Sequence, residues 1–116
     1  MTTKIHGIAN CDTVKKSRKW LAENAGEVTF HDFRKDGLDA TQAARWYAAV
    51  GDRLINRKGT TWRALDAAEQ ARAGDPAGAQ ALAVAHPALI KRPVVEWPDG
   101  EITVGFDAAD WAARIP

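Results

Sequence analysis

Cysteine is almost absent from this sequence: Cys11 is the one cysteine in 116 residues. A single thiol cannot form an internal disulfide, and no Cys-x-x-Cys pair or Cys/His cluster with zinc spacing is present. A disulfide framework and a structural metal site are therefore excluded, and we expect no bound metal. Cys11 is either a small buried apolar residue, the common fate of a lone cysteine, or a reactive group.

An excess of charge of one sign and a long hydrophobic run are also missing. The chain has 16 basic and 15 acidic residues, a formal net charge of +1, which favours neither a nucleic-acid partner nor an acidic disordered tail. No stretch approaches the roughly 18 apolar residues of a membrane helix, and the first residues lack the apolar core of a signal peptide. We therefore expect a cytoplasmic protein without direct nucleic-acid or membrane partners.

The residues that are present fit one domain. Apolar residues make up 46% of the chain, enough for a core, and 116 residues fall short of the length at which chains usually divide. The balanced charge gives no sign of an oligomer, so we expect a monomer. The three histidines, His6, His31 and His86, lack ligand spacing, and the five tryptophans fall on separate predicted elements. Both sets are interpreted as structural.

The first third of the chain predicts a β-α-β unit. Residues 3–8 contain β-branched residues in partial alternation and predict a strand that ends shortly before Cys11. Residues 12–24 predict a helix, with a capping residue at the start, good helix formers within and Gly26 beyond the end. Residues 27–33 alternate as a second strand does.

A mostly helical middle follows. Asp39 and Gln42 have the spacing of a capping box before a helix over 40–50. Residues 60–90 are rich in alanine and predict three short helices, one of which opens at Pro76.

The last third predicts a β-hairpin and a closing helix. Strand-like runs at 94–97 and 101–106 flank a turn at 98–100, and Asp107 is placed to cap a helix over 108–115. A βαβ crossover makes its two strands parallel, and the hairpin adds an antiparallel pair. The order of elements therefore predicts an α/β fold, a four-stranded mixed sheet flanked by helices.

Cys11 lies where the first predicted strand gives way to the first predicted helix. The unpaired N–H groups and the positive dipole end of a helix N-terminus favour a thiolate over a thiol. Lys15 lies one turn further on, and Lys16, Arg18 and Lys19 add to the positive field. This pattern predicts a nucleophilic cysteine, and the alternative is a buried structural cysteine beside an ordinary solvated helix face.

Two arginines lie at distinctive positions in the chain. Arg57 stands between Asn56 and Gly59 in a turn-like stretch, from which its guanidinium can reach an anionic ligand; a surface salt bridge is the alternative. Arg92 precedes Pro93, and the bond before a proline is the only common site of cis geometry, although most such bonds are trans.

Three segments together, GIANCDTVKKSRKWL, LINRKGTTWR and LIKRPVVEWPDG, resemble the arsenate reductase (ArsC) family, and in particular its YffB-type branch, which is related to Spx. The resemblance covers nearly the whole chain. It implies a thioredoxin-like fold over residues 1–116, with a helical insertion at about 38–90 between the second and third strands. It also implies a cis bond before Pro93, which would pack beside a nucleophilic Cys11.

The resemblance also assigns roles to the arginines. Family arsenate reductases hold the oxyanion with the loop of the cysteine and three arginines, two of which correspond to Arg57 and Arg92. Phe106 stands where arsenate-reducing members carry the third arginine, which favours a substrate other than arsenate. If arsenate is the substrate, Arg34 or Arg63 would have to replace the missing charge.

The sequence thus predicts a glutathione-dependent thiol oxidoreductase with one catalytic cysteine and no bound cofactor. We expect Cys11 to attack a small disulfide or an oxyanion, and glutathione to resolve the adduct, because the chain has no second thiol. Backbone N–H groups from Asp12 to Val14 would cradle negative charge, and Lys15 would favour the thiolate. The predicted substrate-binding residues are Asn10, Asp12, Thr13, Val14, Lys15, Arg57, Arg92 and Pro93.

Two further functions stay open at this point. The first is a genuine arsenate reductase. The second is a non-enzymatic regulatory protein that binds RNA polymerase or another partner, as Spx does. The usual Spx redox switch would need a cysteine at the position of Val14, so redox-gated polymerase binding is not expected.

Overall fold

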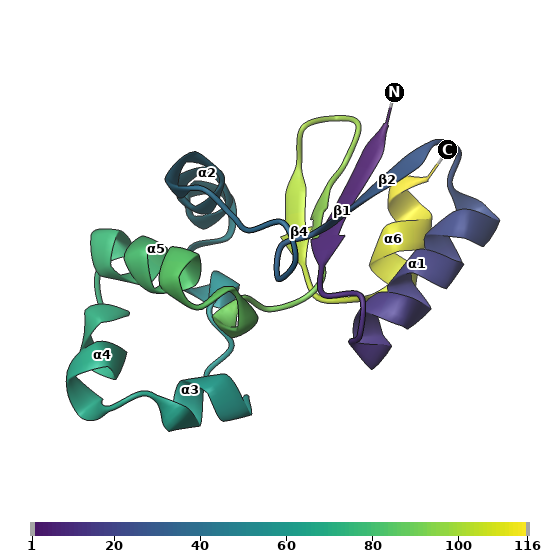
Figure 1. Ribbon diagram of the computed structural model, residues 1–116. Helices are drawn as coiled ribbons and strands as arrows, with labels where there is room; N and C mark the ends of the chain where they lie inside the picture. The colour runs from purple at the N-terminus through teal and green to yellow at the C-terminus, as the bar shows by residue number, and fades with distance from the viewer. Residues whose placement is uncertain (1, 116) are drawn as a thin grey trace.

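The computed structural model describes residues 2–115, and its centre is a four-stranded mixed sheet (Figure 1). The strands are β1 (Thr3–Gly7), β2 (Val28–Asp32), β3 (Val94–Glu96) and β4 (Ile102–Val104). Their order in the sheet is β2-β1-β3-β4, with β1 parallel to β2 and antiparallel to β3, and β3 antiparallel to β4. The predicted α/β arrangement is confirmed.

Helices cover both faces of this sheet. α1 (Asp12–Asn24) and α6 (Ala108–Arg114) lie on one face, and the long segment between β2 and β3 lies on the other (Figure 1). That segment contains α2 (Ala40–Val50), α3 (Thr60–Ala64), α4 (Ala67–Arg72) and α5 (Pro76–Ala85), together with the 3₁₀ helices η1 (Gly51–Leu54) and η2 (Pro87–Leu89). No helix within residues 2–115 has the length and apolarity that a membrane crossing requires.

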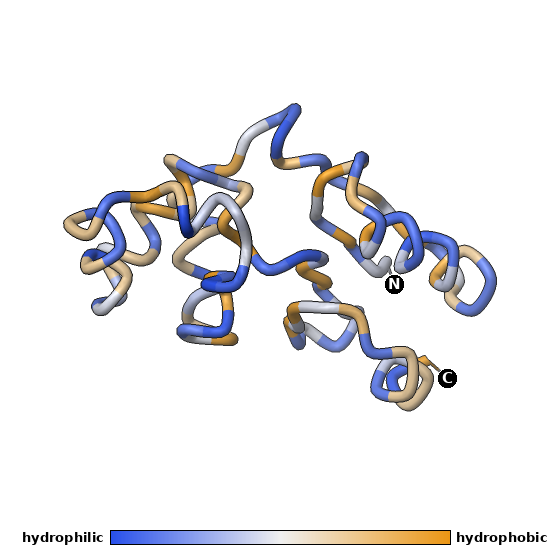
Figure 2. Tube along the Cα trace, turned by 90° about the horizontal axis from the view of Figure 1, so that it is seen from below, coloured by the Kyte–Doolittle hydropathy of each residue, from blue (hydrophilic) through white to orange (hydrophobic). Residues whose placement is uncertain are grey.

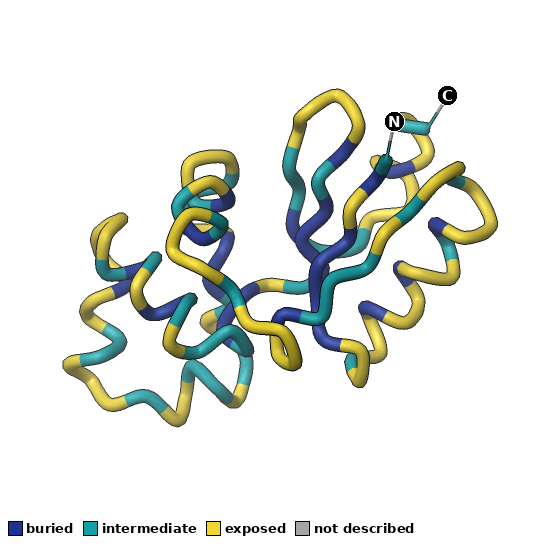
Figure 3. Tube along the Cα trace, turned by 45° about the horizontal axis from the view of Figure 1, so that its top comes forward, coloured by how far each residue is buried: buried dark blue, intermediate teal, exposed yellow. Residues whose placement is uncertain are grey.

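The two faces of the sheet carry separate hydrophobic clusters. Val94 and Val95 are neighbours in β3 but belong to different clusters, because successive side chains of a strand point to opposite faces. Figure 3 shows the buried residues concentrated along the central strands. The cluster beside α1 and α6 contains Ile5, Leu21, Val95, Trp97 and Trp111. The cluster beside α2 and α5 includes Phe33, Trp46, Leu54, Ala83, Ile90 and Val94.

The predicted caps of α2, α5 and α6 are confirmed, but that of α1 is wrong: Asp12 lies within its first turn, and the N-cap is Cys11, which makes no side-chain capping hydrogen bond. α1, α2 and α6 begin where the sequence places them, and α1 is hydrophilic over most of its length (Figure 2). Asp39 and Gln42 form the reciprocal capping box at α2, with side-chain to backbone distances of 2.8 and 3.3 Å. Asp75 caps α5, which opens at Pro76, and Asp107 caps α6.

The strands are shorter than the alternation of residues predicts. β1 ends at Gly7 instead of Ile8, because the chain turns there towards α1. β4 ends at Val104, because Gly105 has φ of +82°, which a strand cannot continue. The two 3₁₀ helices beside the alanine-rich helices are not predicted by the sequence.

A short antiparallel bridge closes the base of the helical segment. Ile55 pairs with Ile90, and the N–H of Asn56 donates to the carbonyl of Leu89 at 2.8 Å. The bridge brings the stretch after α2 beside the stretch that leads into β3. Residues that are far apart in the sequence thereby meet at one end of the sheet.

A buried polar network joins the sheet to α2. The register of β1 and β2 makes His6 the partner of His31, and their Nδ1 atoms lie 3.0 Å apart. Nε2 of His6 lies 2.7 Å from a carboxylate oxygen of Glu96, which also accepts hydrogen bonds from Arg45 and the indole of Trp46. Burial lowers the pKa of His6 to about 4, because a positive charge costs more there than in water, and this outweighs the attraction of Glu96.

The neutral state of His6 predicts a loss of stability in mild acid. The pKa of 6.5 in the unfolded chain falls to about 4 in the folded protein, so the unfolded chain binds more protons between these values. The free energy of unfolding should therefore decrease as the pH falls from 6.5 towards 4, by up to about 3 kcal/mol. Urea denaturation at a series of pH values measures this slope.

A matched pair of variants shows whether His6 causes this pH dependence of the free energy of unfolding. His6→Gln should flatten the pH dependence above pH 4.5, whereas His86→Gln, which alters a partly exposed histidine, should not. Burial alone would raise the pKa of Glu96, but the hydrogen bonds from Arg45 and Trp46 outweigh it and lower this pKa, so Glu96 adds its own loss only below pH 4.5. Equal stability of the wild type at pH 6.5 and pH 5 would contradict the prediction.

Candidate active site

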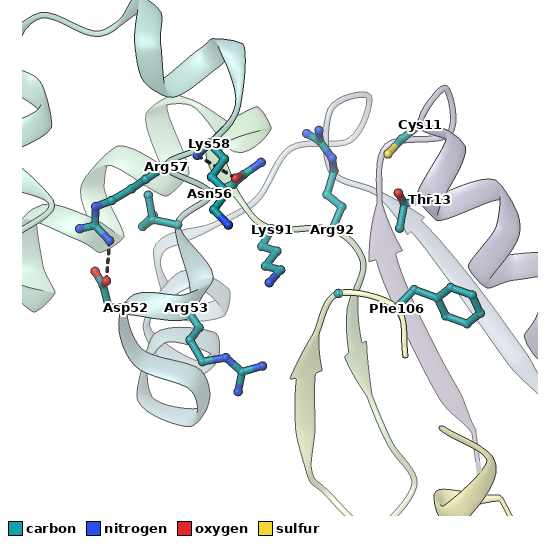
Figure 4. A pocket seen from close by; sticks show the side chains of 12 residues that line it. Cys11, Thr13, Asp52, Arg53, Asn56, Arg57, Lys58, Lys91, Arg92 and Phe106 are labelled. Carbon is teal, nitrogen blue, oxygen red and sulfur yellow. Dashed lines mark hydrogen bonds and ion pairs between the residues drawn. The ribbon is translucent and has the colours of Figure 1, made fainter. Parts of the chain in front are cut away.

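A cavity of about 520 Å³ lies between the helical segment and the end of the sheet where α1 begins (Figure 4). Cys11 and Thr13 form one side, residues after α2 form the other, and Phe106 lies at the edge. The lining contains one acidic side chain, that of Asp52. Its five cationic side chains are those of Arg53, Arg57, Lys58, Lys91 and Arg92. The cavity is therefore strongly positive and suited to an anionic ligand.

Cys11 is the N-cap residue of α1 and is partly exposed. Its carbonyl accepts the N–H of Lys15 at 2.9 Å, while its side chain makes no capping hydrogen bond. Within residues 2–115, the backbone N–H groups of Asp12, Thr13 and Val14 have no acceptor, as expected for the first turn of a helix. The sulfur thus has both access to the cavity and unused donors beside it.

The loop before Cys11 is held by a carboxylate at the end of β2. Asp32 accepts hydrogen bonds from the backbone N–H groups of Ala9, Arg34 and Lys35, at 3.0 to 3.1 Å. Burial alone would raise the pKa of Asp32, but these three hydrogen bonds lower it overall. The charged carboxylate therefore ties the loop of the cysteine to the neighbouring strand.

Arg92 lies on the same side of the cavity as the sulfur. In Figure 4 its guanidinium extends towards the end of the cavity where Cys11 lies, and the sulfur is turned towards it. Nη1 of Arg92 donates to the carbonyl of Ala88 at 3.1 Å, which leaves its other N–H groups available. The bond between Arg92 and Pro93 is cis, as the family resemblance implies.

Arg57 lines the cavity, but its charge is already paired. Nη1 forms an ion pair with Asp52, Nη2 lies 3.5 Å from the carbonyl of Ala73, and the guanidinium carbon lies 5.1 Å from the ring centre of Trp62. Figure 4 shows the side chain directed away from Cys11. The structure thus shows the salt bridge named as the alternative, because a carboxylate five residues earlier is within reach.

Five predicted site residues are outside the lining of the cavity. Asn10 and Lys15 are exposed and contact each other, with Lys15 Nζ 3.4 Å from Asn10 Oδ1. Asp12 is also exposed. The side chains of Val14 and Pro93 are buried, so Val14 can contribute only its backbone N–H. Of the predicted residues, the cavity brings together Cys11, Thr13, Arg57 and Arg92.

The two arginines considered as substitutes for the missing family arginine do not line the cavity either. Arg34 is exposed in the loop after β2, and Nη1 of Arg63 donates to the carbonyl of Lys58 at 2.9 Å. Phe106 does lie at the cavity, and its ring packs against Trp20 and Trp111. Phe106, which stands in place of the third family arginine, therefore forms part of the cavity edge.

Sequence reasoning missed three cavity cations, Arg53, Lys58 and Lys91. Lys58 directly follows Arg57, and Lys91 directly precedes Arg92, so position next to the two motif arginines could have indicated them. Arg53 has no such signal, because only the turn of η1 directs it to the cavity. Within residues 2–115, no group of three or more His, Cys, Asp or Glu side chains is arranged to hold a metal ion.

Comparison with known proteins gives a consistent result. The model of the ArsC family matches residues 6–114. An uncharacterized protein of Haemophilus influenzae is 41% identical over 113 residues, which cover 96% of either chain. A solved structure of a protein named YffB is 42% identical, covers 98% of this chain and 99% of its own, and superposes with a TM-score of 0.91.

A solution structure from Brucella melitensis is also similar. It is described as an arsenate reductase (ArsC) related protein, is 44% identical, and covers 97% of this chain and 93% of its own with a TM-score of 0.76. Both solved structures extend over the helical segment as well as the sheet, so the similarity includes both walls of the cavity.

Proposed function

Since this chain belongs to the ArsC family of thioredoxin-like oxidoreductases, we propose that it is a glutathione-dependent thiol reductase with Cys11 as its only nucleophile. One observation carries the proposal: a partly exposed thiol at the start of a helix opens into a cavity with an excess of positive charge. A thiolate and an anionic substrate are both stabilised in such a place. The substrate we propose is a mixed disulfide of glutathione and a small thiol.

In the first step, the Cys11 thiolate attacks the glutathione sulfur of the mixed disulfide. The old S–S bond breaks, the small thiol leaves as a thiolate, and Cys11 is oxidised to a disulfide with glutathione. The free N–H groups of Asp12, Thr13 and Val14 offset the negative charge shared along the three sulfurs. Arg92 holds an anionic group of the substrate near the sulfur.

In the second step, free glutathione restores the enzyme. Its thiolate attacks the glutathione sulfur attached to Cys11, so that glutathione disulfide forms and the Cys11 thiolate leaves. No protein thiol can carry out this step, since Cys11 is the one cysteine of the chain. In total, one mixed disulfide and one glutathione give one thiol and one glutathione disulfide.

Consumption of NADPH coupled through glutathione reductase tests the proposal. The mixed disulfide of glutathione and 2-mercaptoethanol should be turned over at a rate that depends on both glutathione and the protein. Arsenate should give no turnover above background, because Phe106 offers no hydrogen bond where the family arginine would stand. Arsenate turnover without disulfide turnover would overturn the proposal in favour of an arsenate reductase.

The variant Arg92→Met tests the role of the arginine near the sulfur. Loss of charge-assisted hydrogen bonds to the substrate should lower kcat/KM by about tenfold or more. Arg72→Met makes the same change on an exposed residue of α4 and should leave kcat/KM within about twofold. An unchanged kcat/KM in Arg92→Met would remove this residue from the proposed mechanism.

A further inference from the structure

Four of the five cavity cations have no role in the mechanism above: Arg53, Arg57, Lys58 and Lys91. Two of them, Arg53 in η1 and Lys91 directly before Arg92, come close to the same part of the sheet. We propose that Arg53 and Lys91 form a second anion-binding subsite, at the Gly105 end of the cavity, that binds a carboxylate of the substrate. This inference rests on the proposed thiol chemistry and specifies its substrate class: thiols and disulfides whose carboxylate is separated from the sulfur by several bonds.

The backbone fixes the two cations next to each other. The N–H of Lys91 donates to the carbonyl of Leu54 at 2.8 Å, and the adjoining residues Ile55 and Ile90 form the bridge at the base of the helical segment. Lys91 thus follows one bridge residue, and Arg53 lies two positions before the other. Both side chains line the same cavity.

Gly105 marks the place of this subsite. A Cβ atom built on Gly105 would lie 3.3 Å from Cε of Lys91 and 3.9 Å from its Nζ, so the end of the lysine side chain lies beside this glycine. Arg53 and Gly105 also share the lining of a second, adjoining cavity of about 360 Å³. Lys91 therefore borders this glycine, and Arg53, from a different element, lines both cavities that meet there.

Neither cation has a partner among the residues that the structure describes. Across residues 2–115, the side chains of Arg53 and Lys91 form no ion pair and no hydrogen bond. The one acidic side chain of the cavity, Asp52, is already paired with Arg57. Two neighbouring positive charges repel each other, and an external anion offsets this repulsion.

The subsite lies apart from the reacting sulfur. In Figure 4, Arg92 extends towards the Cys11 end, whereas Lys91 and Arg53 extend away from it. The end of the Lys91 side chain lies beside Gly105. A compact anion at the sulfur would reach Arg92 but not Lys91 or Arg53. A ligand that satisfies both ends carries a second negative charge at a distance from its sulfur, as glutathione disulfide does with its carboxylates.

The rate at which Cys11 forms a mixed disulfide tests this inference without enzymatic turnover. The thiolate attacks one sulfur of a symmetrical disulfide, the S–S bond breaks, Cys11 is oxidised and one thiolate leaves. Two probes are compared by mass spectrometry: glutathione disulfide, which carries carboxylates, and 2-hydroxyethyl disulfide, which is neutral. The variants are Arg53→Met, Lys91→Met and the double variant, with Lys35→Met as an exposed control outside the cavity.

The double variant should lower the rate with glutathione disulfide by about tenfold, and each single variant by roughly threefold. The rate with the neutral disulfide should change by less than about twofold in all of them, and Lys35→Met should behave as the wild type. A higher salt concentration should reduce the wild-type preference for glutathione disulfide. Equal losses with both probes, or no loss with either, would overturn the subsite.

Calorimetric binding of S-methylglutathione supplies a second readout, since this thioether keeps the carboxylates and cannot react with Cys11. The double variant should bind it about tenfold more weakly than the wild type. Absence of binding to the wild type would overturn the subsite even if disulfide turnover is observed. Conversely, charge-dependent binding without glutathione-dependent turnover would support the subsite and refute the proposed reductase reaction.

Discussion

Replacing Cys11 with serine should abolish disulfide reduction, with kcat/KM falling by at least about 10³-fold. A serine hydroxyl is not ionised near neutral pH, and its oxygen cannot take the place of sulfur in a disulfide. The chain has no second thiol that could substitute for it. The glutathione-dependent consumption of NADPH measures this loss directly.

The thermal stability of Cys11→Ser serves as a control for its fold. Cys11 is the N-cap of α1 without a side-chain capping bond, and serine is a favoured N-cap residue whose oxygen can accept a backbone N–H. Cys11→Ser should therefore keep the wild-type Tm or raise it slightly. Retained disulfide reduction would identify another nucleophile, whereas lost activity with a lowered Tm would reflect damage to the fold.

Replacing Trp46 with alanine should produce the largest loss of stability, about 3–5 kcal/mol in the free energy of unfolding. Trp46 is fully buried, packs against His6 and Phe33, and donates its indole N–H to Glu96 at 3.2 Å. Its removal would leave a cavity between α2 and the sheet and take one hydrogen-bond donor from a partly buried carboxylate. Urea denaturation at pH 7 measures the change.

Two further variants separate packing from hydrogen bonding. Trp46→Phe keeps most of the apolar volume and should cost about 1–2 kcal/mol, chiefly through the lost indole donor. Trp62→Ala truncates a partly exposed tryptophan and should cost less than Trp46→Ala. Small domains have about 5–15 kcal/mol of stability in total, so Trp46→Ala should be close to unfolding. A loss below about 1 kcal/mol in Trp46→Ala would contradict its role in joining α2 to the sheet.

Most of the fold could be predicted from the sequence because its signals are local. Asp39, Asp75 and Asp107 each cap the helix that follows, and the caps fix where α2, α5 and α6 begin. The alternation of residues and the crossover rule predict which strands are parallel. The ends of the strands are harder to predict, since the φ of +82° at Gly105, which ends β4, is not determined by the neighbouring residues alone.

The candidate site could be predicted only in part, because side-chain pairing between distant segments leaves no local pattern. The position of Cys11 before a helix predicts a reactive thiol, whereas the role of Arg92 follows only from the family resemblance. The pairing of Arg57 with Asp52, by contrast, depends on the turn that η1 makes. The contact between His6 and His31 depends on the register of two strands, so their separation of 25 residues conceals it.

The bridge between Ile55 and Ile90 also separates the part of the chain that carries the nucleophile from the part that supplies most of the cavity cations. The nucleophile lies on the sheet side, whereas Arg53, Arg57 and Lys58 come from the helical segment near the bridge. Lengthening a closed loop costs little conformational entropy, about 0.6 kcal/mol for each doubling. Mutations in the segment closed by this bridge can therefore change the cavity wall that faces the substrate, while Cys11 keeps its position on the sheet side. Related proteins can in this way acquire new substrate specificities with the same nucleophile.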